Sequence, residues 1–132
     1  MIDAGSMGSR IHIYRFNYCQ ASPMLEYETF KEVKPGLSAY PDQPEKAADS
    51  LEPLLQLAMA SIPEELLECT PIAVKATAGL RLLGKDKSDA ILKAIEHKIK
   101  NNYPFLLPSK EGVILMGGKE EGNIKNCYID KR

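Results

Sequence analysis

The sequence predicts an α/β domain in which helices pack on a mixed five-stranded sheet, and three observations lead to this fold class. Residues 10–18 and 24–33 alternate polar and apolar side chains and are rich in aromatic and β-branched residues, as strands are. Residues 47–62 and 86–102 repeat apolar side chains at helical spacing. Two short apolar runs have the composition of buried parallel strands.

The composition excludes several classes of protein. The chain has 132 residues with 17 basic and 18 acidic side chains, so its formal net charge is -1. It is 44% hydrophobic and 27% charged, which is typical of a globular domain and not of a disordered chain. A charge so close to zero gives no reason to expect a nucleic acid partner. No apolar run approaches the roughly 18 residues that cross a bilayer, so we expect no membrane segment and no targeting signal in this chain.

The first two predicted strands form a hairpin. Residues 10–18 (RIHIYRFNY) and 24–33 (MLEYETFKEV) are separated by a turn signal at 19–23. The charged residues of the second strand suit an exposed sheet edge. Residues 34–44 hold three prolines and predict a loop.

The first predicted helix contains a proline in an awkward place. Pro53 lies within the apolar repeat of residues 47–62, and its missing N–H removes a helical hydrogen bond. Two arrangements fit: Ser50 caps a helix whose first turn holds Pro53, or Pro53 kinks a longer helix. The second predicted helix, 86–102, has no such interruption.

The order of the elements predicts how the sheet is built. A strand at the start of the chain pairs with the hairpin on one side and with the runs at 71–77 and 112–116 on the other, through right-handed crossovers. The loops at Asp3, Thr77 and Gly117 then meet at the carboxyl ends of neighbouring parallel strands. Open α/β sheets bind their ligands at this edge.

The segment DAGSMGSR, residues 3–10, is the first of three motifs at this edge. Its small residues let backbone N–H groups come close to an anion, and its serines add hydroxyl donors. Asp3 is suited to hold a divalent cation through water, and Arg10 adds positive charge. A glycine-rich turn without a ligand is the alternative interpretation.

The segment KATAGLRLL, residues 75–83, follows a predicted strand and opens a helical turn. Thr77 could bond a phosphate-bound water, and the N–H groups of the turn could face an anion. The alternative is an ordinary strand-to-helix junction with Arg81 in a structural salt bridge.

The third motif is GGKEEG, residues 117–122. A carboxylate at a strand end in a glycine-framed loop can act as a general base on water, and a solvated acidic turn is the alternative. No single motif decides the function, but their shared placement on one sheet edge indicates one site.

In this order, DAGSMGSRIHIY, KATAGLRLL and MGGKEEG resemble the apyrase family of nucleoside diphosphate and triphosphate diphosphohydrolases. The surrounding sequence, in segments such as CTPIAVKATAGLRLLG and SLEPLLQLAM, is most similar to the Golgi guanosine-diphosphatase branch. The resemblance implies an actin-like (ribonuclease-H-like) fold of two lobes, of which residues 1–122 would be the N-terminal lobe only.

The resemblance also implies roles for individual residues. Asp3 corresponds to the family's metal-associated aspartate, which acts largely through coordinated water. Glu121 corresponds to the catalytic base that deprotonates the attacking water. The phosphate-binding residues that it implies are Ser6, Met7, Gly8, Ser9, Arg10, Thr77 and Arg81. At Met7 the family prefers Ser or Thr, so a hydroxyl donor is lost and the backbone amide is kept.

The activity that the resemblance implies is hydrolysis of GDP or UDP to the nucleoside monophosphate and phosphate. It would depend on a divalent cation (calcium, magnesium or manganese). The implied location is the Golgi lumen or membrane, in the glycosylation pathway.

The resemblance ends after Gly122. The family continues with an aromatic–Trp segment and a long helix, whereas residues 123–132 read NIKNCYIDKR and the sequence has no Trp. We therefore expect a divergent tail at 123–132 and a missing second lobe with its own phosphate loop. Positioning by both loops supplies roughly 7–11 kcal/mol in reactions of this kind, so we expect this chain alone to be inactive or nearly so.

A non-catalytic module that binds phosphate or another protein is the alternative function. An actin-like ATPase or a sugar kinase shares the Asp–Gly loop, but those families do not pair it with ATAGLRLL and a Glu–Gly end.

Histidines and cysteines predict no zinc site, because His12 and His97 are far apart and no CxxC spacing exists. We expect His12 to pack or lie on the surface and His97 to be solvated. If the protein is luminal, as the resemblance implies, Cys19 and Cys69 could form a disulfide.

Overall fold

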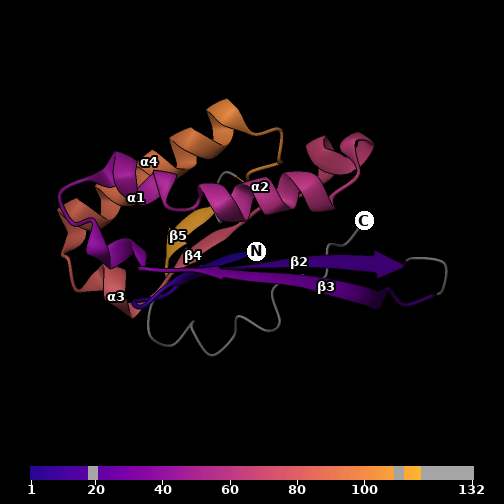
Figure 1. Ribbon diagram of the computed structural model, residues 1–132, viewed down its shortest axis with the longest axis horizontal. Helices are drawn as coiled ribbons and strands as arrows, with labels where there is room; N and C mark the ends of the chain where they lie inside the picture. Colours follow the sequence, from indigo (N-terminus) through magenta and orange to yellow (C-terminus); the bar gives the residue numbers. More distant parts are fainter. Residues whose placement is uncertain (18–20, 109–111, 117–132) are drawn as a thin grey trace.

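The computed structural model describes residues 1–17, 21–108 and 112–116. These residues form a five-stranded sheet with the order β3-β2-β1-β4-β5 (Figure 1). The strands are β1 (Ile2–Ala4), β2 (Ser9–Asn17), β3 (Met24–Val33), β4 (Val74–Ala76) and β5 (Val113–Leu115). β2 is antiparallel to β1 and β3, whereas β4 is parallel to β1 and β5. The mixed sheet predicted from the sequence is therefore confirmed.

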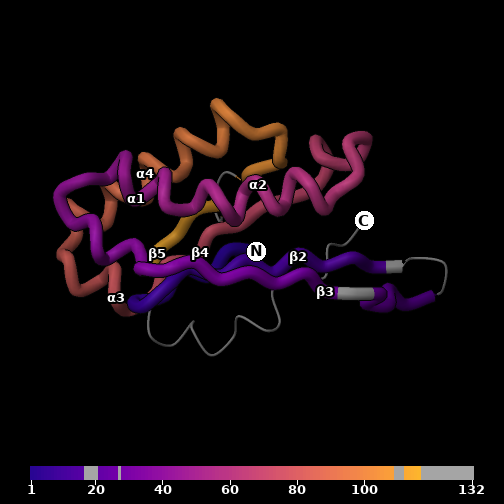
Figure 2. The backbone as a smooth tube through the Cα atoms, viewed as in Figure 1, coloured from indigo at the N-terminus to yellow at the C-terminus, as the bar shows by residue number. Residues whose placement is uncertain are grey.

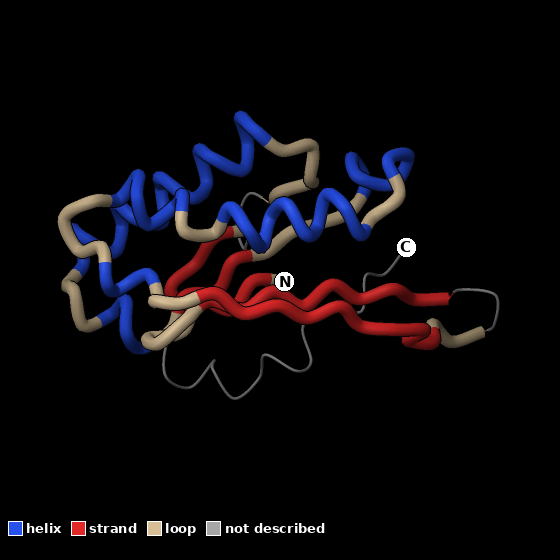
Figure 3. The backbone as a smooth tube through the Cα atoms, viewed as in Figure 1, coloured by secondary structure: helices blue, strands red, loops and turns tan. Residues whose placement is uncertain are grey.

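The long helices lie on one side of the sheet (Figure 3). The helices are α1 (Pro44–Asp49), α2 (Glu52–Ser61), α3 (Ala78–Arg81) and α4 (Lys85–Asn102), with 3-10 turns η1 (Leu37–Ala39) and η2 (Glu64–Cys69). α2 runs along the β2–β3 hairpin, and α1 packs on α4 (Figure 2). The short α3 follows β4 directly, at the end of the sheet where β1 turns into β2.

The core lies between the helices and the nearer face of the sheet. Ile2 and Val74 are in register on β1 and β4 and are completely buried. From the other side, α4 contributes Ile91, Ile95 and Ile99, each at most 1% exposed. Full burial of such a side chain stabilises the fold by about 1.5–3 kcal/mol, so this apolar layer is the main source of its stability.

Strand alternation divides the central residues between the two faces of the sheet. Ala4 and Ala76 are paired and belong to the core, so their side chains point toward the helices. Asp3 and Lys75 are paired between them and therefore point to the opposite face. Arg10, the β2 partner of Asp3, lies on that opposite face as well.

The helical region around Pro53 resolves the two predicted arrangements. The helix is interrupted at Ser50 and Leu51, and α2 begins at Glu52. Pro53 therefore lies in the first turn of α2, as one of the two arrangements required. The proposed cap was wrong. Ser50 Oγ donates to the carbonyl of Ala47, 2.6 Å away, and so bonds backward into α1 instead of capping α2.

The other differences from the sequence prediction concern length and short turns. The parallel strands are shorter than the apolar runs at 71–77 and 112–116, because only Val74–Ala76 and Val113–Leu115 form ladders. The predicted loop at 34–44 contains η1, and η2 occupies a segment for which no element was predicted. The predicted second helix is confirmed as α4.

Candidate active site

Three strand ends meet at the predicted ligand edge. Ala4 is in register with Ala76, and Ala76 is in register with Leu115, so β1, β4 and β5 end at the same level of the sheet. Segments more than 70 residues apart in the chain are thereby brought side by side (Figure 1). The predicted convergence of the first two motifs at one edge follows from this register.

Asp3 is held beside two charged side chains on the face of the sheet opposite the helices. Its Oδ2 lies 3.9 Å from Arg10 Nη1, and Arg10 Nε lies 3.2 Å from Glu32 Oε1. Asp3 Oδ1 is shielded from solvent and has no hydrogen-bond partner among the described residues. A buried carboxylate oxygen of this kind carries a desolvation cost unless a ligand satisfies it.

The turn between β1 and β2 is the predicted phosphate loop. Gly5 N donates to the carbonyl of Gly8 at 2.9 Å, which closes the turn. Ser6 and Met7 at its tip are exposed, Met7 by 76%, so the tip is open to a ligand. Ser38 Oγ donates to the carbonyl of Ser6 at 3.3 Å and ties the tip to η1.

Two glycines allow other segments to pack directly on this turn. A Cβ at Gly79 would lie 2.6 Å from Ser6 Cα, and a Cβ at Gly36 would lie 2.4 Å from the carbonyl oxygen of Gly5. Real Cβ atoms do not approach backbone so closely. The turn is therefore clamped between the segment after β3 and the start of α3.

Ser9 lies differently from the other residues of its motif. It is the first residue of β2, pairs with Ala4 and is completely buried. Alternation places its side chain on the core face, away from Asp3, and its Oγ has no partner among the described residues. A role for Ser9 in phosphate binding stays a prediction.

Thr77 joins the ends of β1 and β4. Its backbone N–H donates to the carbonyl of Ala4 at 3.1 Å, and its Oγ1 donates to the same carbonyl at 3.4 Å. The hydroxyl oxygen keeps its lone pairs as acceptors. Thr77 is half-buried at the edge, beside the clamped turn.

Arg81 links α3 to the end of β5. Its Nη1 donates to the backbone carbonyl of Met116, the residue after the strand. This interaction is a hydrogen bond to a backbone carbonyl, and the structural salt bridge that was the alternative for Arg81 stays a prediction. It fixes the point from which the chain continues toward the third motif.

Lys75 is a charged residue of this region that the prediction did not single out. It is 5% exposed, at the centre of β4 between Val74 and Ala76. A signal was present in the sequence, because a lysine interrupts the otherwise small and apolar run PIAVKAT. Long charged side chains are rarely buried without a specific environment.

The third motif and the predicted catalytic base lie outside the described residues. Glu121, Glu120 and the glycines at 117 and 118 follow Met116, and their placement stays a prediction. Cys19 also lies outside the described residues, so its pairing with Cys69 stays a prediction as well.

Among the described residues, Asp3 could hold a divalent cation only through water molecules bound to the cation. They contain no group of three or more His, Cys, Asp or Glu side chains that could enclose a metal ion. One carboxylate with a free oxygen is the arrangement expected for a hydrated cation, since magnesium keeps several waters and binds through one or two carboxylates.

The histidines lie away from this edge or on the surface, as expected. His12 Nδ1 contacts Glu28 Oε1, and its ring lies 5.1 Å from that of Phe30. His97 is bonded to Asn101 on the exposed side of α4.

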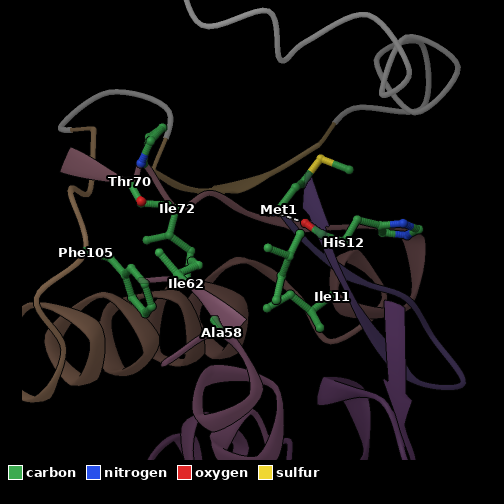
Figure 4. Close-up of a pocket in the computed structure, with 10 residues that line it drawn as sticks. Met1, Ile11, His12, Ala58, Ile62, Thr70, Ile72 and Phe105 are labelled. Carbon is green, nitrogen blue, oxygen red and sulfur yellow. Dashed lines mark hydrogen bonds between the residues drawn. The ribbon is translucent and has the colours of Figure 1, made fainter. Parts of the chain in front are cut away.

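A small apolar pocket lies at the opposite end of β1 (Figure 4). Met1, Ile11, Ile62, Ile72 and Phe105 are among the residues that line it, and its volume is about 50 Å³. Pockets for drug-sized ligands are usually about 300–1,000 Å³, so this one is too small for a nucleotide.

Comparison with known proteins identifies the family. The model of the GDA1/CD39 (nucleoside phosphatase) family matches residues 1–128. The chain belongs to this nucleoside phosphatase family. Membership confirms the apyrase resemblance and, with the observed sheet, the actin-like fold class.

Relatives of the nucleoside phosphatase family match most of the chain. It is 55% identical over 122 residues to a guanosine-diphosphatase of Schizosaccharomyces pombe, which covers 92% of this chain and 22% of the relative. It is 52% identical to a guanosine-diphosphatase of Saccharomyces cerevisiae, with 92% and 24% covered. It is 48% identical over 124 residues to ectonucleoside triphosphate diphosphohydrolase 5 of Gallus gallus, with 92% and 28% covered. The chain thus spans about a quarter of the length of these relatives.

Within the described residues, no helix combines the length and the apolar character that a membrane span requires.

Proposed function

We propose that this chain is the phosphate-binding part of a nucleoside-diphosphate phosphohydrolase. The observation that carries the proposal is the packing of the first motif on the second at one sheet edge. Ser6 lies against Gly79, and Thr77 is bonded to Ala4. This packing supports a single anion site formed by both motifs and speaks against two unrelated turns.

Asp3 is the residue that we assign to the divalent cation (calcium, magnesium or manganese), which it would hold through water. Its unpartnered Oδ1 supports the assignment, since a coordinated water would satisfy that oxygen. The cation would supply charge that offsets the negative charge of the phosphates.

The phosphate chain is assigned to the turn and its neighbours. Ser6, Met7, Gly8 and Ser9 offer backbone N–H groups, with the exposed tip at Ser6 and Met7 open to the ligand. Arg10, Thr77 and Arg81 add two guanidinium groups and a hydroxyl. In this scheme they bind and orient the diphosphate, and the Arg81–Met116 bond aligns the segment that carries the base.

Glu121 is the proposed general base. It would take a proton from the water that attacks the terminal phosphorus, as the bond from that phosphorus to the bridging oxygen breaks. The products are the nucleoside monophosphate and inorganic phosphate. GDP and UDP are the proposed substrates, and the guanosine-diphosphatase and nucleoside-diphosphatase names of relatives support a diphosphate substrate.

The isolated chain is proposed to bind without efficient turnover. It would correspond to the N-terminal lobe at 1–122 with a divergent tail at 123–132, and a second phosphate loop would come from a second lobe. We extend the proposal to a Golgi location in the glycosylation pathway on the resemblance alone. Imaging of the tagged full-length gene product beside a Golgi marker tests this last point.

Calorimetry and a phosphate-release assay on the purified chain test the function. We expect GDP or UDP with a divalent cation to bind, with phosphate release far below the usual median turnover of about 10 per second. Turnover at that rate would contradict the inactivity of the chain. Absence of any binding by a folded chain would contradict the anion site itself.

A further inference from the structure

The backbone carbonyls of Gly5 and Ser6 both face the segment 36–38, which leads into η1. A Cβ built on Gly36 would lie 2.4 Å from the Gly5 oxygen and 2.7 Å from the Ser6 oxygen. Ser38 Oγ donates to the same Ser6 oxygen at 3.3 Å. One segment of the chain therefore sets the direction in which the Ser6 carbonyl points, through backbone packing and through a hydroxyl.

The direction of these two carbonyls fixes the direction of two N–H groups. In a trans peptide the C=O and N–H bonds point in opposite directions, and the one cis bond among the described residues is Lys34–Pro35. The N–H groups of Ser6 and Met7 therefore point away from the segment 36–38. Both residues are exposed, and within the described part of the chain no backbone hydrogen bond uses either N–H. Successive N–H groups that are open in this way suit an anion.

Met7 depends most on this orientation, because its N–H is the only donor that it can offer. Its thioether has no proton to donate, whereas Ser6 has a hydroxyl as well. A rotation of the Ser6–Met7 peptide would turn the N–H away from a phosphate and bring the Ser6 carbonyl oxygen toward it, and this oxygen repels an anion. The bond from Ser38 is longer than the usual 2.5–3.0 Å for a hydroxyl donor, so the packing at Gly36 shares the task of preventing that rotation.

We propose that Ser38 is a positioning residue of the anion site, whose hydroxyl holds the Ser6–Met7 peptide with its N–H toward the phosphate. This inference rests on the proposed function. It adds a residue of the connection between β3 and α1 to the motifs at the sheet edge. Ser38 acts on the phosphate through the Met7 amide and contacts the turn itself.

Calorimetric titration of the 132-residue chain with inorganic pyrophosphate and magnesium is the first test. We expect Ser38→Ala to bind pyrophosphate about threefold to tenfold more weakly, as the loss of one hydrogen bond implies, and Ser38→Thr to restore the affinity. Ser50→Ala is the matched control. Ser50 is also half-buried and its hydroxyl also donates to a backbone carbonyl, that of Ala47, but it lies between α1 and α2. This variant should bind as the unaltered chain does.

The amide signal of Met7 is the second readout, because a merely structural role of Ser38 would not change it. The chain has five methionines and Met1 has no amide proton, so selective ¹⁵N-methionine labelling gives four signals, and Met7→Leu identifies the one from Met7. Saturating pyrophosphate should move the Met7 proton downfield in the unaltered chain, since the amide then donates to an anionic oxygen. The movement should be smaller in Ser38→Ala and should return in Ser38→Thr.

The outcomes separate this inference from the function on which it rests. If the unaltered chain binds pyrophosphate and Ser38→Ala binds it equally well, the inference fails and the anion site stands. Weaker binding with an unchanged movement of the Met7 signal assigns the loss to general destabilisation and also overturns the inference. If the folded, unaltered chain does not bind, the anion site fails and the role of Ser38 fails with it. Should Ser38→Ala not fold, Ser38→Cys keeps the shape with a weaker donor and should give the same result.

Discussion

Arg81 donates a hydrogen bond from Nη1 to the backbone carbonyl of Met116, 35 residues later in the chain. This contact joins the start of the second crossover to its end. Arg81, which its motif assigns to phosphate binding, thus also holds the chain at Met116, the last described residue before the third motif. In the proposed scheme, phosphate binding and alignment of the proposed base Glu121 would share this side chain.

Replacement of Arg81 by Met should reduce both stability and ligand binding. Hydrogen bonds that involve a charged group contribute about 1.5–3 kcal/mol, so we expect a loss of that order in the free energy of unfolding. Urea denaturation measures it. Arg15→Met on the exposed hairpin removes a surface ion pair and should cost less than about 1 kcal/mol. Equal losses in the two variants would contradict a structural role for the Arg81–Met116 bond.

Gly79→Ala should displace the turn that carries Ser6. The added Cβ would lie 2.6 Å from the Ser6 backbone, so the turn or the start of α3 has to move. We expect a destabilisation of about 1–3 kcal/mol and a loss of pyrophosphate binding in calorimetry. Gly84→Ala is the control, because Gly84 has φ +91 and no atom within 4 Å of its added Cβ. That variant should be strained by about 1–2 kcal/mol and still bind.

Asp3→Asn should remove the dependence of nucleotide binding on the divalent cation. The amide keeps the shape of the side chain but not the charge that attracts a hydrated cation. Titration of GDP with and without magnesium should show a gain from magnesium in the unaltered chain and none in the variant. Glu65→Gln, in the exposed η2 turn, is the matched loss of one carboxylate and should leave the gain intact. A magnesium effect that survives Asp3→Asn would exclude Asp3 as the cation residue.

The pH dependence of stability should include a contribution from Glu52. Hydrogen bonds from Lys98, Tyr103 and Gln56 lower the pKa of Glu52 to about 2 from its ordinary value of 4.5. Because the folded-state pKa is lowered, the stabilisation is complete above about pH 4.5 and is lost as the pH falls toward 2. The Glu52 side chain is 41% exposed, so solvent screening keeps the contribution small.

Urea unfolding of the unaltered chain and of Glu52→Gln at several pH values measures this contribution. The difference between the two proteins should be present at pH 7 and shrink toward pH 2. Lys98 Nζ lies 2.7 Å from Glu52 Oε2 and 2.9 Å from Asp49 Oδ1, so the same network joins α4 to α1 and to α2. A difference that does not change with pH would assign the effect of the variant to packing.

The alternation of polar and apolar residues and the order of the predicted elements along the chain predicted the sheet, because each strand has a distinct pattern. The alternation of the hairpin and the small apolar run before Thr77 leave few ways to arrange five strands once right-handed crossovers are required. The break at Ser50 was harder to predict, since Pro53 is compatible with both a first turn and a kink. Which hydrogen bond a serine makes depends on local backbone geometry that the sequence does not specify.

The site was predicted less completely than the fold. The motifs located Asp3, the turn and Thr77 because they lie at strand ends. The hydrogen bond of Arg81 to Met116 was not predicted, because Met116 follows another strand and carries no sequence signal. Ser9 was grouped with its loop, although the alternation of β2 turns its side chain to the core. Lys75 was missed because a single lysine in an apolar strand is more often read as a solvated residue than as a buried charge.

The clamping of the Ser6 turn by Gly36 and Gly79 links the affinity of the protein for its ligand to the completion of its tertiary structure. The turn is local in sequence, but the two surfaces that hold it come from the connection after β3 and from the crossover after β4. A partly folded chain that has formed only the hairpin would lack both surfaces. A bound anion should therefore raise the free energy of unfolding of the whole described domain, and its affinity would report whether distant segments have docked.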